Sequence, residues 1–195
     1  SGKQGYEIAI ALNKCGIKTT LIAGPSSLIF PKDLKVKKIT SADEMLNEVK
    51  KLLPVDLAVC AAAVTDFKPL EKNKNKIKKE NIKYNEINFI KNLDILEYIS
   101  KNNKHRPRLV AGFSAETEKL IKNSISKIKR KHCDIIFANN VSQAGTGFNS
   151  DYNKISVIDK TGYVKTIPKN KKSFIANKIA EILLDKLLIN DKNIN

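Results

Sequence analysis

Apolar residues recur along this chain alternately at helical and at strand spacing, a pattern typical of βαβ units around a largely parallel sheet. Helical spacing is found at residues 4–15, 42–53, 93–99, 117–131 and 174–188. Short apolar runs predict strands at residues 18–23, 36–39, 56–64, 109–115 and 134–138. Three of the helices have expected N-caps, namely Ser41, Asn92 and Ser173. We therefore expect an α/β domain with a mostly parallel sheet and helices on both faces.

The C-terminal part of the chain predicts a β-hairpin followed by a helix. Residues 155–158 and 163–167 are the two strands of this hairpin, and they are joined across Lys160-Thr161-Gly162. The final helix reaches about Leu188, and the polar residues 190–195 are expected to form a disordered tail. With 195 residues and 42% hydrophobic content, the chain can bury one substantial core, so residues 1–189 are predicted to be one domain.

Two features predict a ligand site near the carboxyl ends of the strands. The strand at residues 56–64 ends in alanines, which leave room where ligands of open α/β sheets bind. Ser1-Gly2-Lys3-Gln4-Gly5 leads directly into a helix, whose first amide groups and dipole attract anions. This motif lacks the upstream glycines of a P-loop, so an ordinary glycine-rich helix start is the alternative. The lysine-rich residues 68–83 have no apolar period and predict a loop or a lid.

The formal net charge of +16 suggests nucleic-acid binding, but the composition argues against it. Only three of the 36 basic residues are arginine. The aromatic residues are 6% of the chain, without tryptophan, and they do not interleave with the lysines as a base-stacking platform requires. We therefore favour a lysine-coated surface and no nucleic-acid partner. No apolar run reaches the length of about eighteen residues that a membrane span needs, so no membrane partner is expected.

Six motifs of the chain can be compared with known families. Three follow predicted strands: Ala61-Ala62-Ala63-Val64-Thr65-Asp66-Phe67, Gly112-Phe113-Ser114-Ala115-Glu116-Thr117 and Ala138-Asn139-Asn140-Val141-Ser142. The others are Asn75-Lys76-Ile77-Lys78-Lys79, Lys91-Asn92-Leu93-Asp94-Ile95-Leu96 and Gly145-Thr146-Gly147-Phe148-Asn149-Ser150-Asp151. Together, over nearly the whole chain, they resemble the bacterial phosphopantothenate-cysteine ligases. Such a ligase is usually the C-terminal half of a fused coenzyme A biosynthesis enzyme, whose N-terminal half is a flavin-dependent decarboxylase.

The resemblance implies a Rossmann-like fold and a two-step ligase reaction. The phosphopantothenate carboxylate attacks the α-phosphate of CTP, which releases pyrophosphate and leaves an acyl-cytidylate, and the amine of cysteine then displaces CMP. This chemistry depends on positioned cations and Mg²⁺ more than on a nucleophilic side chain. The resemblance also implies a homodimer and a cytoplasmic location, with FMN only in a decarboxylase half outside this sequence. The family's first strand precedes Ser1, so the sheet is expected to lack it.

Three residues correspond to family positions with distinct roles. Lys76 corresponds to a lid lysine that neutralises phosphate charge as the acyl-cytidylate forms. Asp66 corresponds to a nucleotide-binding acid that accepts from the sugar or base of CTP or helps to hold Mg²⁺. Phe113 corresponds to an aromatic residue that contacts cytosine. Considered singly, these residues also fit a solvated loop, a turn aspartate and a core aromatic residue.

Lys127 and Lys131 correspond to triphosphate-binding positions, and their spacing of four places both ammonium groups on one helix face. Any lysine-rich helix offers such pairs by chance. Further positions correspond to nucleotide-lining residues, namely Ala61, Ala62, Asn92 and Asp94. Substrate contacts are implied for Ser1, Gly2 and Asn139. For Asn139, which is expected to begin a loop, an Asx turn is the alternative.

Leu93 and Asn140 depart from the family pattern, which usually has proline and aspartate there, and make the nucleotide geometry less certain. An ATP-using variant of the same ligase is the first alternative. An NAD(P)-dependent oxidoreductase lacks support, because no GxGxxG follows a predicted strand. From a different class, a basic nucleic-acid-binding module is the remaining alternative, and the composition disfavours it.

Overall fold

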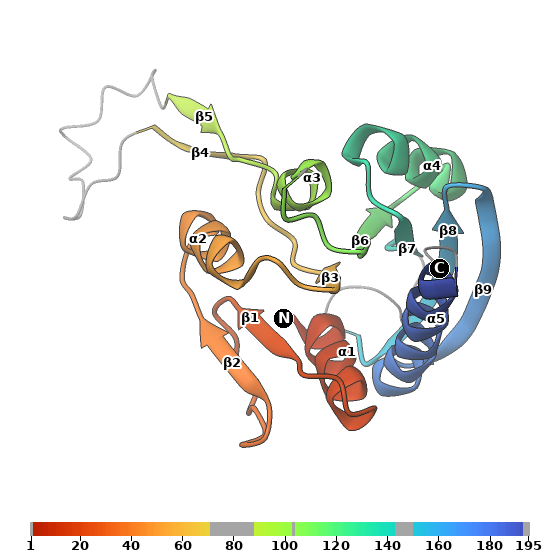
Figure 1. Cartoon of the computed structure of the whole chain (residues 1–195). Coiled ribbons are helices and arrows are strands. Elements are labelled where there is room, and N and C mark those ends of the chain that lie inside the picture. The colour runs from red at the N-terminus through yellow and green to blue at the C-terminus, as the bar shows by residue number, and fades with distance from the viewer. Residues whose placement is uncertain (1, 71–87, 103, 143–149, 193–195) are drawn as a thin grey trace.

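The structure is a computed structural model that describes residues 2–70, 88–102, 104–142 and 150–192. Helices and strands alternate along these residues (Figure 1). In chain order the elements are α1 (Lys3–Lys14), β1 (Thr20–Ala23), β2 (Lys35–Lys38), α2 (Ala42–Leu52), β3 (Leu57–Cys60), β4 (Phe67–Pro69), β5 (Phe89–Lys91), α3 (Ile95–Lys101), β6 (Leu109–Glu116), α4 (Leu120–Lys131), β7 (Ile135–Asn140), β8 (Tyr152–Asp159), β9 (Gly162–Lys171) and α5 (Lys172–Lys192).

A five-stranded mixed sheet forms the centre of the molecule, in the order β3-β6-β7-β8-β9. Strands β3, β6 and β7 run parallel, and the C-terminal hairpin β8–β9 adds two antiparallel strands. Strands β1 and β2 form a separate parallel pair. Among the described residues no strand joins β1 to β3, so this pair is not hydrogen-bonded to the central sheet (Figure 1). The predicted α/β class with a C-terminal hairpin and helix is confirmed.

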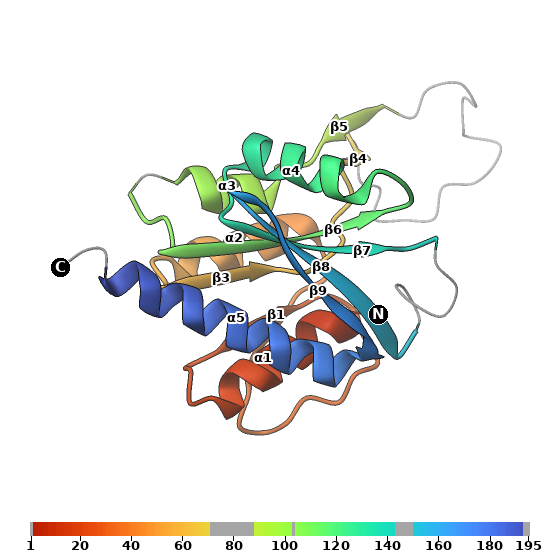
Figure 2. The ribbon, with the colours of Figure 1, turned by 90° about the vertical axis from the view of Figure 1, so that its right-hand side faces the viewer.

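Helices cover both faces of the central sheet, as the sequence predicted (Figure 2). Helices α1 and α5 pack on one face, in a core that includes Ala111, Phe137 and Ile179. Helices α2, α3 and α4 pack on the other face, around Val110 and Ile136. Consecutive residues of β6 and of β7 therefore pack into the cores on opposite faces of the sheet, because successive side chains of a strand point to opposite faces. This explains why both strands read as continuous apolar runs.

Close approach of α3 to β6 depends on Gly112. A Cβ added at this residue would lie 2.6 Å from Cδ2 of Leu96 and 2.9 Å from Cδ1 of Ile136, closer than real Cβ contacts. The glycine thus allows α3 to lie directly against the sheet. This contact matters for the site below, because α3 carries two of its carboxylates.

The helix starts agree with the predicted caps in one case and differ in two. Ser41 Oγ accepts from the backbone N of Glu44, so Ser41 caps α2 as predicted. The predicted cap Asn92 is wrong: Asp94 caps α3, accepting from the backbone N of Glu97 at 2.8 Å. Ser173 is also wrong as a cap, because α5 begins at Lys172, directly after β9.

Several predicted boundaries also differ from the structure. Strand β3 ends at Cys60 rather than at residue 64, because its pairing with β6 stops at Gly112. Helix α4 begins at Leu120 rather than 117, since β6 continues to Glu116. Helix α5 runs to Lys192, so the predicted tail is helical at residues 190–192, while 193–195 lie outside the described residues. The antiparallel ribbon β4–β5 was not predicted.

Candidate functional site

The carboxyl ends of the parallel strands β3, β6 and β7 lie at one edge of the central sheet, beside the N-terminal part of α1. A Cβ added at Gly5 would lie 3.2 Å from Cβ of Ala61, so small residues on both sides allow this contact. The glycine-rich helix start and the alanines after β3 are therefore neighbours. Ligands of open α/β sheets bind at this edge.

Beside the N-terminus of α1, Lys3 lies close to Lys172 of α5 and to Asp151, which precedes β8. Gly2, with φ +65°, is the N-cap, and within the described part of the chain no side chain caps the helix. Lys3 Nζ forms an ion pair of 2.6 Å with Asp151 Oδ1, and the Asp151 carbonyl accepts from the backbone N of Lys172 at 2.8 Å. Lys172 is only 4% exposed, and burial, followed by the charge of Lys3, lowers its pKa. This positive group is suited to an anion.

A second positive group lies on α4, where Lys127 and Lys131 share a face as their spacing predicts. Lys127 Nζ donates to the carbonyl oxygen of Phe113 at 2.7 Å. Lys131 Nζ pairs with Asp94 Oδ2 at 2.7 Å and with Glu97 Oε2 at 2.9 Å. The fold thus brings together four residues that the family motifs indicated, from α3, β6 and α4.

The carboxylates of α3 balance much of the charge of Lys131. Burial alone would lower the pKa of Lys131, but hydrogen bonds to Asp94 and Glu97 raise it overall. Hydrogen bonds from Lys101 and then Lys131 hold the pKa of Glu97 at about 2. Burial would raise the pKa of Asp94, yet hydrogen bonds from Lys131 and from the backbone N of Glu97 lower it overall. All these groups are therefore charged at neutral pH.

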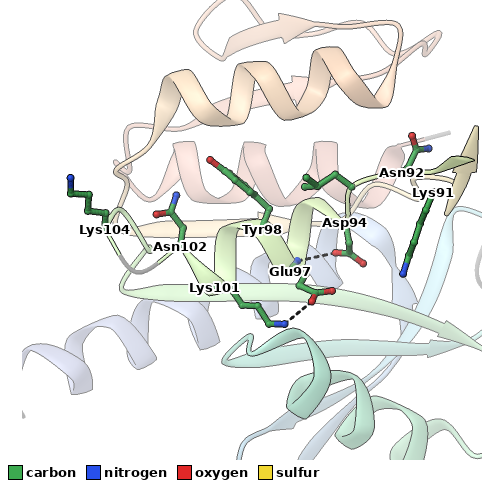
Figure 3. Close-up of a pocket in the computed structure, with 9 residues that line it drawn as sticks. Lys91, Asn92, Asp94, Glu97, Tyr98, Lys101, Asn102 and Lys104 are labelled. Carbon is green, nitrogen blue, oxygen red and sulfur yellow. Dashed lines mark hydrogen bonds and ion pairs between the residues drawn. The ribbon is translucent and has the colours of Figure 1, made fainter.

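A hollow of about 900 Å³ lies along α3, next to this cluster (Figure 3). Its lining includes Asn92, Asp94, Glu97 and Tyr98. Figure 3 shows Tyr98 directed to the opposite side of α3 from Glu97. The ring of Tyr98 lies 5.5 Å from Lys50 Nζ of α2. The hollow thus adjoins the ion-paired residues and extends along α3 between charged and aromatic side chains.

Asn92 connects the segment after β3 to the start of α3. Its Nδ2 donates to the carbonyl of Thr65 at 2.8 Å, and its backbone N donates to the carbonyl of Asp66 at 2.8 Å. The Oδ1 atom of Asn92 is buried and has no hydrogen-bond partner among the described residues. The side chain of Asp66 is exposed beside it. Two of the predicted nucleotide-lining residues are therefore neighbours.

Phe113 and Asn139 are placed differently from the simplest expectation. The ring of Phe113 packs against Phe137, with ring centroids 5.5 Å apart, so the half-buried Phe113 also belongs to the core. Asn139 does not begin a loop, because it lies inside β7 and is only 8% exposed. The Asx turn is formed by Asn140, whose Oδ1 accepts from the backbone N of Ser142 at 2.9 Å.

Ser1 and Lys76 lie outside the described residues, as does most of the motif at residues 145–151. Among the predicted lining residues, Ala62 is exposed just after β3 and Ala61 is half-buried. The sequence reasoning missed Glu97 and Glu116. Glu97 stands three residues after the cap Asp94, so capping-box spacing offered a signal for it, whereas Glu116 is marked only by its place in the motif at residues 112–117.

Comparisons with known proteins agree with this arrangement. Residues 1–187 match the family described as DNA/pantothenate metabolism flavoprotein C-terminal domain. The chain belongs to that family. It is 37% identical over 185 residues to the coenzyme A biosynthesis bifunctional protein CoaBC of Borreliella burgdorferi, an alignment that covers 94% of this chain and 46% of the relative. The chain thus spans about half the length of such curated relatives.

Two solved structures resemble the fold. A crystal structure of the C-terminal domain of a CoaBC protein superposes with a TM-score of 0.77 at 26% identity, covering 98% of this chain and 84% of that one. A Cab2 mutant in complex with phosphopantothenate-cysteine has a TM-score of 0.71 at 14% identity, covering 98% and 80% of the two chains. At that identity the second likeness shows the fold only.

Proposed function

We propose that this chain is the ligase part of a coenzyme A biosynthesis enzyme and joins 4'-phosphopantothenate to cysteine with CTP. One observation supports this most directly. The start of α1 contacts Ala61 just after β3, and Asn92, which donates to Thr65 of the same segment, precedes Asp94, the partner of Lys131. Both positive groups therefore adjoin the segment after β3, as a reaction between one phosphorylated acid and one nucleotide requires. Family membership and the similarity to coenzyme A biosynthesis bifunctional proteins agree with the proposal.

In the proposed reaction, the chain binds, orients and neutralises charge. Lys127 and Lys131 receive the triphosphate of CTP, while Asp94, Asn92 and the alanines after β3 line the nucleotide. Ser1, Gly2 and Asn139 contact phosphopantothenate, whose carboxylate attacks the α-phosphate and releases pyrophosphate. The cysteine amine then attacks the acyl carbon of the acyl-cytidylate and displaces CMP. Preorganised cations stabilise the charge that develops on the phosphoryl oxygens.

Mg²⁺ accompanies the nucleotide in this proposal. Among the described residues no three His, Cys, Asp or Glu side chains are clustered to hold a metal. Mg²⁺ bound to nucleotides takes most of its ligands from phosphates and water, so one exposed carboxylate such as Asp66 is a sufficient protein ligand. The residues present therefore fit an ion that enters with CTP.

The test of this function is pyrophosphate release by the full-length protein. CTP together with phosphopantothenate should yield pyrophosphate before cysteine is added, because the acyl-cytidylate forms first. Equal turnover with ATP at matched concentration would instead identify the ATP-using variant. No release with either nucleotide would contradict the ligase assignment.

Lys76 is the proposed catalytic lysine of this reaction. If it acts where charge develops, Lys76→Gln should slow acyl-cytidylate formation while leaving CTP affinity nearly unchanged. Quench-flow measurement of the intermediate, paired with calorimetric titration of CTP, separates these effects. If Lys76→Gln forms the acyl-cytidylate at the wild-type rate, residues 75–79 have no catalytic role and are a solvated loop.

The proposal also includes a homodimer and a cytoplasmic location. Ribbon β4–β5 projects from the body (Figure 1) and exposes Phe67, Leu70 and Phe89 by more than half of their surface. Exposed apolar groups of this kind mark association surfaces. Sedimentation should show a dimer for the wild type and weaker dimerisation for Phe67→Asp.

Within the described part of the chain, no helix is long and apolar enough to cross a bilayer.

A further inference from the structure

We propose that Glu116 is a positioning residue for the triphosphate site, holding the ammonium group of Lys127 charged and in place at the carboxyl end of β6. This inference rests on the proposed function in one respect, the assignment of Lys127 to the triphosphate. Neither the charge pattern nor the helical spacing of the sequence singles out Glu116. Its role follows from contacts that connect β6 to α4.

The carboxylate of Glu116 is fixed by two neutral donors. Ser114 Oγ donates to Glu116 Oε1 at 2.6 Å, and Ser114 itself is only 1% exposed. Asn123 Nδ2, in the first turn of α4, donates to Glu116 Oε2 at 2.9 Å. The N-cap residue of α4, Lys119, makes no side-chain cap hydrogen bond. Glu116 therefore anchors the beginning of the helix that carries Lys127 and Lys131.

Lys127 needs such an anchor because it is half-buried. Its ammonium group donates to a neutral acceptor, the carbonyl of Phe113, at 2.7 Å. Burial lowers the pKa of Lys127, and the charges that act on it are Glu116 from β6, Asp94 from the start of α3, Cys133 before β7 and Arg130 from α4. Of the charges that favour the protonated amine, Glu116 has the largest effect, and Arg130 opposes it.

Two consequences follow for the nucleotide site. No ion pair within 4.0 Å joins the described side chains of Glu116 and Lys127, so the carboxylate acts through space and leaves the ammonium group available to a phosphate. Because its two oxygens already accept hydrogen bonds, Glu116 is held away from the phosphate instead of competing for Lys127. Lys131 differs, because its ammonium group forms direct ion pairs with two carboxylates, those of Asp94 and Glu97.

Glu116→Gln removes the charge while keeping the size of the side chain. The amide can still accept from Asn123 and donate to Ser114 Oγ, so the fold should persist. The matched control is Glu118→Gln, which removes an exposed carboxylate two residues away. The first measurement is the pH dependence of limited acetylation of Lys127, read by mass spectrometry without any nucleotide. It should move to lower pH in Glu116→Gln and stay at the wild-type position in Glu118→Gln.

The second measurement is CTP affinity across the same pH range. For Glu116→Gln, affinity should fall by roughly three- to ten-fold at the alkaline end and little at neutral pH, because only the charge state of Lys127 changes. Glu116→Asp, which restores the charge, should recover most of the loss. A purely structural role would lower affinity equally at every pH, and that result would overturn the proposal.

Each remaining outcome is decisive. An acetylation profile of Lys127 that does not change in Glu116→Gln contradicts the proposal, whatever happens to CTP. A changed profile with unchanged CTP affinity supports the link between Glu116 and Lys127 and instead contradicts the assignment of Lys127 to the triphosphate. If Glu116→Gln does not fold, Asn123→Ala replaces it. That variant loosens the carboxylate, so its profile must move in the same direction by less, and an unmoved profile again overturns the proposal.

Discussion

The two positive groups that adjoin the segment after β3 differ in how their charge is balanced. On α4, the ammonium group of Lys131 is paired with Asp94 and Glu97, both within 3 Å. At the start of α1, Lys3 is paired with Asp151, and the neighbouring Lys172 has a lowered pKa because it is buried. An anion at α4 must therefore replace carboxylates, whereas an anion at α1 adds negative charge where little is present. This difference suits a triphosphate at α4 and a single phosphate at α1.

The largest expected effect is the loss of CTP affinity in Lys131→Gln, because Lys131 is the lysine whose charge two carboxylates balance. Losing Lys131 removes the ion pair of Asp94 and one of the two lysines paired with Glu97, so negative charge remains beside the triphosphate and CTP affinity should fall roughly ten- to one-hundred-fold. Adding Glu97→Gln to this variant should restore part of the affinity, because one repelling charge is removed. Calorimetric titration checks both variants. If the double variant binds CTP as weakly as Lys131→Gln alone, the charge of Glu97 does not influence CTP affinity.

The next effect concerns the start of α1, and the test compares two glycines with positive φ, one at each end of this helix. Gly2 and Gly16 have φ values of +65° and +79°, and an added Cβ would meet no atom within 4 Å at either. Alanine at either position should cost about 1–2 kcal/mol, because L residues are strained there. Only Gly2→Ala should also weaken phosphopantothenate binding, by about three-fold to ten-fold. If Gly2→Ala and Gly16→Ala lose the same affinity for phosphopantothenate, the start of α1 is not specifically part of its binding site.

A smaller effect is expected in the acid stability of the α3 carboxylates. The pKa of Glu97 is lowered from 4.5 to about 2, so the folded state binds its proton less readily than the unfolded state. The stabilisation is present above 4.5 and is lost as pH falls towards about 2. Because a third of the Glu97 side chain (33%) is exposed and solvent screens its ion pairs, the effect should be at most about 1 kcal/mol. Urea unfolding of Glu97→Gln should show a flatter pH dependence in this window, and an unchanged slope would contradict the prediction.

The smallest effect concerns the lysines outside both groups. If they form a diffuse coat, binding of duplex DNA should be weak and should disappear at a physiological salt concentration of about 0.15 M. Fluorescence anisotropy of a labelled duplex across a salt series measures this. Tight, sequence-dependent binding at that salt would mean that a nucleic acid, rather than CTP, is the polyanion that this surface recognises.

Periodicity and turn residues allowed most elements to be predicted, but not their ends. The helix capped by Ser41 and the buried strands β6 and β7 follow from local sequence, because side-chain spacing reports which face is buried. The caps predicted at Asn92 and Ser173 are wrong for different reasons, since α5 already begins at Lys172, one residue before Ser173. A polar side chain near a helix start can cap the helix or bond elsewhere, and Asn92 bonds to Thr65, 27 residues away. Ribbon β4–β5 was missed because its strands have only three residues each.

For the candidate site, the sequence by itself determined the α/β class, the order of the elements and the residue types available to bind phosphate. The spacing of Lys127 and Lys131 was sufficient to place them on one helix face, because helix geometry is local. Only the tertiary structure decided their partners. Helices α3 and α4 and strand β6 meet through packing, and this pairs Lys131 with Glu97, 34 residues away, and anchors Asn123 to Glu116. Spacing cannot reveal such contacts, because their geometry depends on how the elements pack around the sheet.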